Sequence, residues 1–293
     1  MAPWTVALEI TPPRQPSPHV LLRRARLLGE GIEAVNVIQR PDRQPSLDAC
    51  LALRAAGLRP VLHLVTRGRS RAEVIAELHA AAAGGIDCIL CVRGDHTAQD
   101  RDDTPSLRET VALARRLAPA VTVGVTFNQQ AADRRAALRN LVAKLEAGAA
   151  FVQTQPVFEP AELQPLIEQV RTTAPQTRIV PMVMPLLSFK MAAALGARLG
   201  MRLPAPLVRR LEQGGEEAGW KTFSETLAAL IQPGWADGVA VMTFEPDPPA
   251  ATGHRIRAAL FETGWMLRGG NNCTAKGLQW LGDIPYSYRQ LTT

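Results

Sequence analysis

Eight short apolar runs, each followed by a longer segment with helical spacing of Leu and Ala, constrain the fold of this chain more than any other feature. Such alternation indicates parallel strands joined by helical crossovers. Eight units within 293 residues predict an α/β fold built as one closed (β/α)8 barrel, a TIM barrel. An open doubly wound sheet is the alternative, but no G-x-G-x-x-G follows the first run. The runs cover residues 5–10, 33–39, 59–66, 87–93, 120–127, 150–156, 178–184 and 238–243.

The segments between the runs carry helix signals of their own. Ser70 and Glu73 have the spacing of a capping box, residues 72–83 favour a helix, and two glycines follow at 84–85. The connection between the seventh and eighth runs is longer than the others. We expect its residues 189–233 to hold two or three extra helices.

The length favours a single large domain, because 293 residues with 46% hydrophobic content can bury one substantial core. Residues 1–268 would form the catalytic barrel, and residues 269–293 a C-terminal tail. The tail contains Trp280, Tyr286 and Tyr288, whose aromatic surfaces favour burial. We expect it to pack on the barrel or on a partner subunit in a homo-oligomer. A lid over the cofactor pocket is the alternative.

The charge and hydrophobicity of the chain indicate which kinds of partner it can bind. The net charge of +6 comes mostly from arginines spread over predicted helices, a pattern typical of a solvated face. It also suits an anionic ligand such as a dinucleotide, but no nucleic-acid-binding motif accompanies it. No run is long and apolar enough to span a membrane, and the first residues lack the features of a secretory signal. We therefore expect a cytoplasmic protein with neither a nucleic-acid nor a membrane partner.

The four cysteines show neither a disulfide framework nor paired zinc spacing, and no metal site is expected. Cys88 and Cys91 form C-x-x-C, but they lie within a predicted strand, where residues three apart point to opposite faces. Free cysteine is commonly buried, so we expect both to pack in the core.

Polar residues near the carboxyl ends of the predicted strands are the site candidates, because the chemistry of such barrels lies there. Glu9 and Asp95 are the most informative, since a carboxylate is costly to bury without a purpose. His63 is equally compatible with a hydrogen-bonded core residue. The full set is Glu9, Asn36, His63 with Thr66 and Arg67, Arg93 with Asp95, Asn128, Gln153 with Gln155, and Thr243.

Several motifs, in order along nearly the whole chain, resemble the methylenetetrahydrofolate reductase family. Each is weak alone, but their order and spacing together are fairly specific. They are Glu9-Ile10-Thr11-Pro12-Pro13-Arg14, His63-Leu64-Val65-Thr66, Arg93-Gly94-Asp95, residues 140–149 leading to Thr154-Gln155, Ile179-Val180-Pro181 with Pro185, Phe189-Lys190, and Arg202-Leu203-Pro204.

The resemblance implies reduction of 5,10-methylenetetrahydrofolate to 5-methyltetrahydrofolate by NAD(P)H through a bound flavin, FAD. It implies that Glu9 protonates N10 and opens the five-membered ring, while Asp95 stabilises the cationic iminium beside flavin and pterin. Gln155, Phe189 and Thr243 would join Asp95 in binding the folate. The cofactor residues implied are Asn36, His63, Thr66, Arg93, Gly94, Asn128 and Lys144, the last holding phosphate or ribose.

The sequence departs from the family pattern where flavin binding is concerned. After the fifth strand the family has Tyr-Pro-Glu-x-His-Pro, whereas this chain has Thr126-Phe127-Asn128-Gln129-Gln130-Ala131 and lacks the histidine. Ile38 and Met191 replace a threonine and a glutamine of the family. Three interpretations follow: flavin bound through altered contacts, direct hydride transfer from NAD(P)H, or a folate-binding protein with another one-carbon role.

Two unrelated enzyme classes on the same barrel are disfavoured. A Schiff-base aldolase needs a lysine inside the barrel mouth, but Lys144 precedes the sixth run and Lys190 follows the seventh. A metal-dependent hydrolase needs clustered histidines and carboxylates, which His63 and Asp95 alone do not provide.

Overall fold

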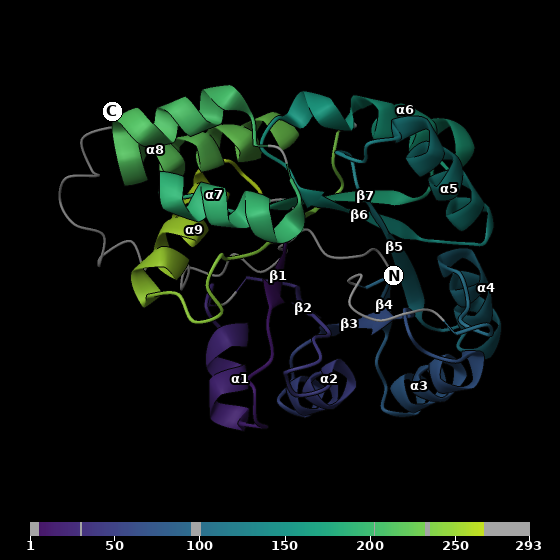
Figure 1. Ribbon diagram of the computed structural model, residues 1–293. Helices are drawn as coiled ribbons and strands as arrows, with labels where there is room; N and C mark the ends of the chain where they lie inside the picture. The colour runs from purple at the N-terminus through teal and green to yellow at the C-terminus, as the bar shows by residue number, and fades with distance from the viewer. Residues whose placement is uncertain (1–5, 30, 95–100, 202, 232–234, 267–293) are drawn as a thin grey trace.

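A closed parallel barrel forms the centre of the molecule, as the sequence predicts (Figure 1). The computed structural model describes residues 6–29, 31–94, 101–201, 203–231 and 235–266. Within these residues each strand pairs with the next in sequence, and β8 pairs with β1 to close the barrel. The strands are β1 Val6–Ile10, β2 Ala34–Val37, β3 Pro60–Val65, β4 Cys88–Val92, β5 Thr122–Phe127, β6 Phe151–Pro156, β7 Arg178–Val183 and β8 Val239–Val241.

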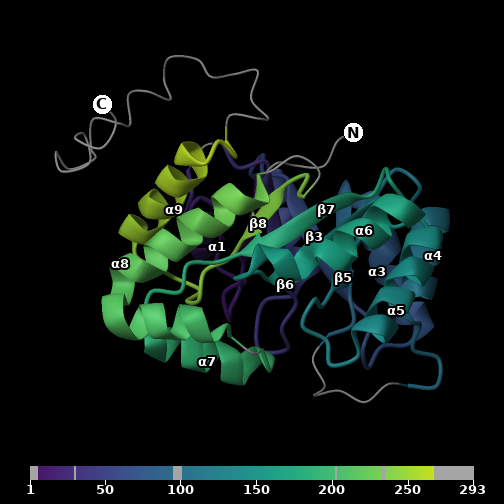
Figure 2. The same ribbon diagram turned by 90° about the horizontal axis from the view of Figure 1, so that it is seen from above.

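Helices surround the strands on the outside of the barrel (Figures 1 and 2). The extra connection between β7 and β8 holds two of them, α7 and α8, within the range expected from its length. They contact each other, and α8 also contacts α9. The helices are α1 Pro18–Ala25, α2 Ser46–Ala55, α3 Arg71–Ala83, α4 Leu107–Leu117, α5 Arg134–Glu146, α6 Gln164–Thr173, α7 Phe189–Leu199, α8 Ala205–Leu230 and α9 Ala250–Glu262, with a short 3-10 helix at Pro160–Leu163.

Local sequence signals explain where several helices begin. The predicted capping box starts α3: Ser70 accepts a hydrogen bond from the Glu73 backbone N–H, and the Glu73 carboxylate accepts one from the Ser70 backbone N–H. Ser106 and Glu109 form a second capping box at α4. Each pair satisfies backbone donors that the first helical turn leaves without partners.

The interior of the barrel is filled mostly by small side chains and by the ring of Phe151. A separate apolar cluster contains Ala7, Ala34, Val61, Phe151 and other residues from the strands. Gly124, the register partner of Phe151 on β5, leaves the space that this ring occupies, since a Cβ at Gly124 would lie closer than 3.0 Å to three ring atoms. The ring therefore lies in the apolar interior of the barrel.

The cysteines follow the strand alternation. Cys88 belongs to the interior cluster and Cys91 to the larger core between strands and helices, so the two thiols lie on opposite faces of β4. Both are free and buried, as expected. Burial raises the pKa of the Cys91 thiol to about 12, which makes it a poor nucleophile at neutral pH.

The C-terminal boundary of the core lies beyond α9. Trp265 is 1% exposed, and its indole N–H donates to the Leu227 carbonyl oxygen of α8 at 3.0 Å. The predicted tail, residues 269–293, lies outside the described residues, so its packing stays a prediction. In the described part of the chain, no helix combines the length and hydrophobicity that crossing a membrane requires.

Candidate active site

Four polar side chains from four strands converge at the carboxyl-terminal mouth of the barrel. Glu9, Asn36, His63 and Gln153 each stand two residues beyond an interior apolar residue of the same strand. Because alternate residues of a strand share a face, the strands that bury Ala7, Ala34, Val61 and Phe151 direct these four side chains inward as well. The barrel therefore has an apolar floor and a polar layer above it.

Hydrogen bonds link three members of this layer. Asn36 Nδ2 donates to Gln153 Oε1 at 2.7 Å, and Gln153 Nε2 donates to Glu9 Oε2 at 3.2 Å. Glu9 Oε2 also lies 3.8 Å from His63 Nε2. The carboxyl group predicted to be the acid thus accepts a hydrogen bond from an amide and has an imidazole nitrogen nearby.

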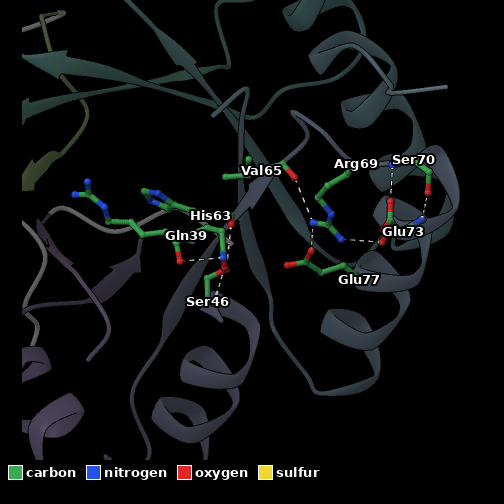
Figure 3. A network of polar contacts seen from close by, with 9 residues as sticks. Gln39, Ser46, His63, Val65, Arg69, Ser70, Glu73 and Glu77 are labelled. Atoms are coloured by element: carbon green, nitrogen blue, oxygen red, sulfur yellow. Dashed lines mark hydrogen bonds and ion pairs between the residues drawn. The ribbon is translucent and has the colours of Figure 1, made fainter. Parts of the chain in front are cut away.

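His63 is neutral in this environment. Desolvation lowers the pKa of its imidazole to about 3, and its Nε2 has no hydrogen-bond partner among the described residues. Its backbone carbonyl oxygen accepts a hydrogen bond from the Ser46 hydroxyl, while Gln39 Oε1 accepts one from the Ser46 N–H (Figure 3). These contacts fix the strand, but they leave the ring nitrogen near Glu9 without a hydrogen bond.

A second network stabilises the loop that leaves β3. The Arg69 guanidinium pairs with Glu77 and donates to the carbonyl oxygens of Val65 and Glu73 (Figure 3). It joins the end of β3 to the first turns of α3. This arrangement holds the strand end that carries His63 in place.

A cavity of about 530 Å³ adjoins Glu9 at the barrel mouth. Its walls come from β1, α1, the loop after β2, and the segment from the end of β8 into α9. Glu9 and Thr243, two residues predicted for the site, line it, together with basic residues that include Arg24 and Arg40. Its lining combines arginines, carboxylates and apolar side chains, and its size suits a small organic ligand.

One wall of the cavity is fixed by an ion-pair cluster. Arg24 donates to the Thr11 carbonyl oxygen at 2.7 Å and pairs with Asp247, which also pairs with Arg23. Hydrogen bonds from Arg24, with a smaller contribution from Arg23, lower the pKa of Asp247 to about 2. This cluster was not predicted from the sequence, because Asp247 lies more than 200 residues from the two arginines along the chain.

Lys144 does not face the cavity. Its ammonium group donates to the Thr126 carbonyl oxygen at 2.7 Å, and its side chain is packed between α5 and β5. Desolvation lowers the pKa of Lys144 to about 8. The predicted role in holding a phosphate or ribose is therefore not supported by the position of this ammonium, which lies against β5 and away from the cavity.

The other predicted cofactor residues are mostly engaged within the protein. Asn36 and Thr66 are 0% exposed. Arg93 donates to the Pro105 carbonyl oxygen at 3.2 Å and lies 3.4 Å from the Thr66 hydroxyl. Asn128 is exposed, and its side-chain oxygen accepts from the Gln130 N–H. Gly94 follows Arg93 with a φ of 93°, a conformation that favours glycine.

The predicted folate-binding residues are less closely grouped than the acid and its neighbours. Thr243 lines the cavity, whereas the half-buried Gln155 and the 48% exposed Phe189 do not. Asp95 lies outside the described residues. Gln153 is a site candidate from its place near the end of a predicted strand, whereas the family resemblance implies that Gln155 binds the pterin. Strand alternation assigns both glutamines to the inward face of Phe151, but the register of β6 with β7 shifts between Gln153 and Pro156, and no local pattern in the sequence signals that shift.

Gln129 is a buried polar residue that was quoted only as a departure from the family pattern. It is 2% exposed, and its amide donates to the carbonyl oxygens of Gln155 and Pro156 at 3.1 Å. It therefore ties the loop after β5 to the end of β6. Among the described residues, no group of three or more His, Cys, Asp or Glu side chains has the arrangement of a metal site.

Comparisons with known proteins identify relatives of this chain. The sequence model of the family described as methylenetetrahydrofolate reductase matches residues 2–247. A Caenorhabditis elegans protein described as probable methylenetetrahydrofolate reductase (NADPH) is 25% identical over 289 residues. That match covers 90% of this chain but 43% of the relative, so the chain spans less than half the length of that protein.

One solved structure is similar over most of its length. It is an uncharacterized protein from Clostridium thermocellum that binds two copies of 5-methyl-5,6,7,8-tetrahydrofolic acid. The TM-score is 0.65 at 12% identity, and the match covers 88% of this chain and 94% of that chain. At this identity the similarity establishes the shared fold alone.

Proposed function

We propose that this chain, which belongs to the methylenetetrahydrofolate reductase family, reduces 5,10-methylenetetrahydrofolate to 5-methyltetrahydrofolate with NAD(P)H. The observation that carries the proposal is the Glu9 carboxyl group, which lines the cavity at the barrel mouth and accepts a hydrogen bond from Gln153. A carboxyl group in a largely desolvated site is suited to proton donation near neutral pH. As part of the same proposal, the reaction serves one-carbon metabolism in the cytoplasm.

The reaction has two steps in this proposal. Glu9 donates a proton to N10 of the folate, the bond between N10 and the bridging carbon breaks, and the electron pair stays on N10. The bridging carbon becomes an N5 iminium ion, which the carboxylate left on Glu9 stabilises electrostatically. A hydride from C4 of the nicotinamide then adds to this carbon and forms the methyl group, while NAD(P)⁺ is released.

The described residues do not fit a flavin held in the manner that the family resemblance implies. Asn36 and Thr66 have no exposed surface, and the Lys144 ammonium donates to the β5 backbone. The family histidine after β5 is absent, and Gln129 in the corresponding loop is bonded to the end of β6. These observations favour direct hydride transfer from NAD(P)H, and we derive no step through a flavin.

Two kinds of measurement test the proposal. The visible spectrum of the purified protein, before and after added FAD, reports flavin binding directly. Reduction of methylenetetrahydrofolate under anaerobic conditions with NADH or NADPH deuterated at C4 then distinguishes the routes. Direct transfer retains the deuterium in the methyl group, whereas a reduced flavin exchanges its transferable hydrogen with solvent and dilutes the label.

Each outcome has a defined meaning. Stoichiometric deuterium in the product from a colourless protein supports direct transfer. A flavin band that bleaches with NAD(P)H and returns with the folate contradicts direct transfer and supports a flavin held by altered contacts. Tight folate binding with no oxidation of NADH or NADPH contradicts the reductase function and supports another one-carbon role.

A further inference from the structure

Two buried side-chain amides, those of Asn36 and Gln153, form a line of hydrogen bonds across the barrel interior to the Glu9 carboxylate. Asn36 of β2 is 0% exposed and Gln153 of β6 is 1% exposed. Their side chains meet at 2.7 Å, and Gln153 reaches Glu9 of β1 at 3.2 Å. Burying two amides in an otherwise apolar interior carries a free-energy penalty unless they are hydrogen-bonded. The catalytic steps described above assign neither amide a role.

The hydrogen bonds from Asn36 through Gln153 to Glu9 all run in one direction. Asn36 Nδ2 donates to Gln153 Oε1, so the oxygen end of the Gln153 amide faces Asn36 and the NH₂ end faces Glu9. An NH₂ group has no acceptor function, so it meets Glu9 Oε2 as a donor. A proton on Oε2 would compete with this hydrogen bond.

We propose that Gln153, oriented by Asn36, is a positioning residue that fixes the Glu9 carboxyl group and directs its acidic proton to Oε1. The proposal rests on the reductase function above, in which Glu9 supplies the proton to N10. It explains why both amides are buried on the same level as Glu9 rather than replaced by apolar residues like those of the floor below. Holding a reacting group within a narrow range of orientations contributes directly to rate.

The same contact adjusts the pH range of the acid. A donor to a carboxylate favours the ionised form, so loss of the Gln153 N–H would let Glu9 keep its proton to higher pH. Other elements contribute charged or titratable groups around Glu9, and a change from Gln to Met alters the charge of none of them. These groups are His63 of β3, Arg23 and Arg24 of α1, Arg26 after it, Arg40, Asp42 and Arg43 after β2, Glu245 and Asp247 after β8, and His254 of α9.

The first test is kinetic and compares Gln153→Met with Gln164→Met. Gln164 lies on α6, where its amide donates to the Glu168 carboxylate at 3.2 Å on the exposed surface. This variant therefore makes the same chemical change away from the barrel mouth. For Gln153→Met we expect kcat to fall about tenfold or more with a much smaller change in KM. The alkaline limb of the kcat profile should move up by about one pH unit.

A double-mutant cycle tests whether Gln153 acts through Glu9. In a Glu9→Gln background, Gln153→Met should change the residual rate by less than about twofold, because the group it positions has lost its function. Equal losses in both backgrounds, or an unchanged rate and pH profile in Gln153→Met, would overturn the proposal. If Gln153→Met does not fold, Asn36→Leu/Gln153→Met removes both amides together, so neither amide is left buried without the other.

The second test needs no turnover. Infrared difference spectra between the wild type and Glu9→Gln isolate the carboxyl band of Glu9, and its titration midpoint can be followed with pH. The midpoint should rise in Gln153→Met and stay in place in Gln164→Met. An unmoved midpoint contradicts the positioning role, whereas a moved midpoint in a protein that does not oxidise NAD(P)H supports that contact and contradicts only the reductase function.

Discussion

Gly124→Ala tests the packing that supports the polar mouth of the barrel. The added methyl group would lie closer than 3.0 Å to three atoms of the Phe151 ring, whose side chain is 0% exposed. Ala7, Ala34 and Val180 belong to the same buried cluster, so the ring has little room to move away.

The magnitude follows from two opposing terms. Overpacking a rigid core costs up to about 3 kcal/mol. Replacing glycine in a strand lowers the conformational entropy of the unfolded chain and offsets about 0.5–1 kcal/mol. We therefore expect a net loss of about 2 kcal/mol in the free energy of unfolding. For a protein of 293 residues that corresponds to a fall in Tm of about 3 °C.

Urea unfolding followed by circular dichroism measures this loss, with thermal unfolding as a second assay. Gly124→Ala/Phe151→Leu is the control, because removing the ring removes the clash. The double variant should lose less free energy than the sum of the two single variants, by about 1–2 kcal/mol. Additive losses, or a Gly124→Ala protein within about 0.5 kcal/mol of the wild type, would refute the packing argument.

Three further predictions concern separate contacts. Glu9→Gln should lower the rate of methylenetetrahydrofolate reduction by about 10²–10⁴-fold without preventing folate binding, and unchanged turnover would remove Glu9 from the mechanism. The pKa of Lys144 is lowered to about 8 from 10.5, so the folded state binds fewer protons than the unfolded state between these values. Its contribution to stability should accordingly rise with pH over that range, and unfolding measured against pH should show no such rise in Lys144→Met. Ser70→Ala removes the capping box of α3 and should cost about 1 kcal/mol in urea unfolding, whereas a loss near zero would show that tertiary contacts alone fix the helix start.

The barrel could be predicted because its signal is local and repeated. Each strand is a short apolar run bounded by turn residues, and the observed strands fall within or next to the predicted runs. The capping box at Ser70 and Glu73 predicted the start of α3 for the same reason, since its partners are three residues apart. Such signals depend on backbone geometry within one turn or one strand, which the sequence specifies directly.

The polar layer was only partly predictable. Strand alternation places Glu9, Asn36, His63 and Gln153 on inward faces, and each was a candidate from its position in the sequence. Alternation does not say which inward residues meet across a barrel. Gln153 and Glu9 are 144 residues apart, and their contact depends on the closure of β1 onto β8 and on the tilt of the strands.

Lys144 shows most clearly what the tertiary structure decided. Its motif in the chain resembles that of a cofactor-binding lysine, but the way α5 packs on the barrel directs its ammonium to the Thr126 carbonyl oxygen. The cavity beside Glu9 likewise combines α1, the loop after β2 and the segment after β8, which lie far apart in the sequence. The sequence alone determined the order of strands and helices, the family and the inward position of Glu9, because local spacing and motifs encode them. The tertiary structure decided which polar groups touch, since those contacts depend on distances across a closed barrel that no local pattern records.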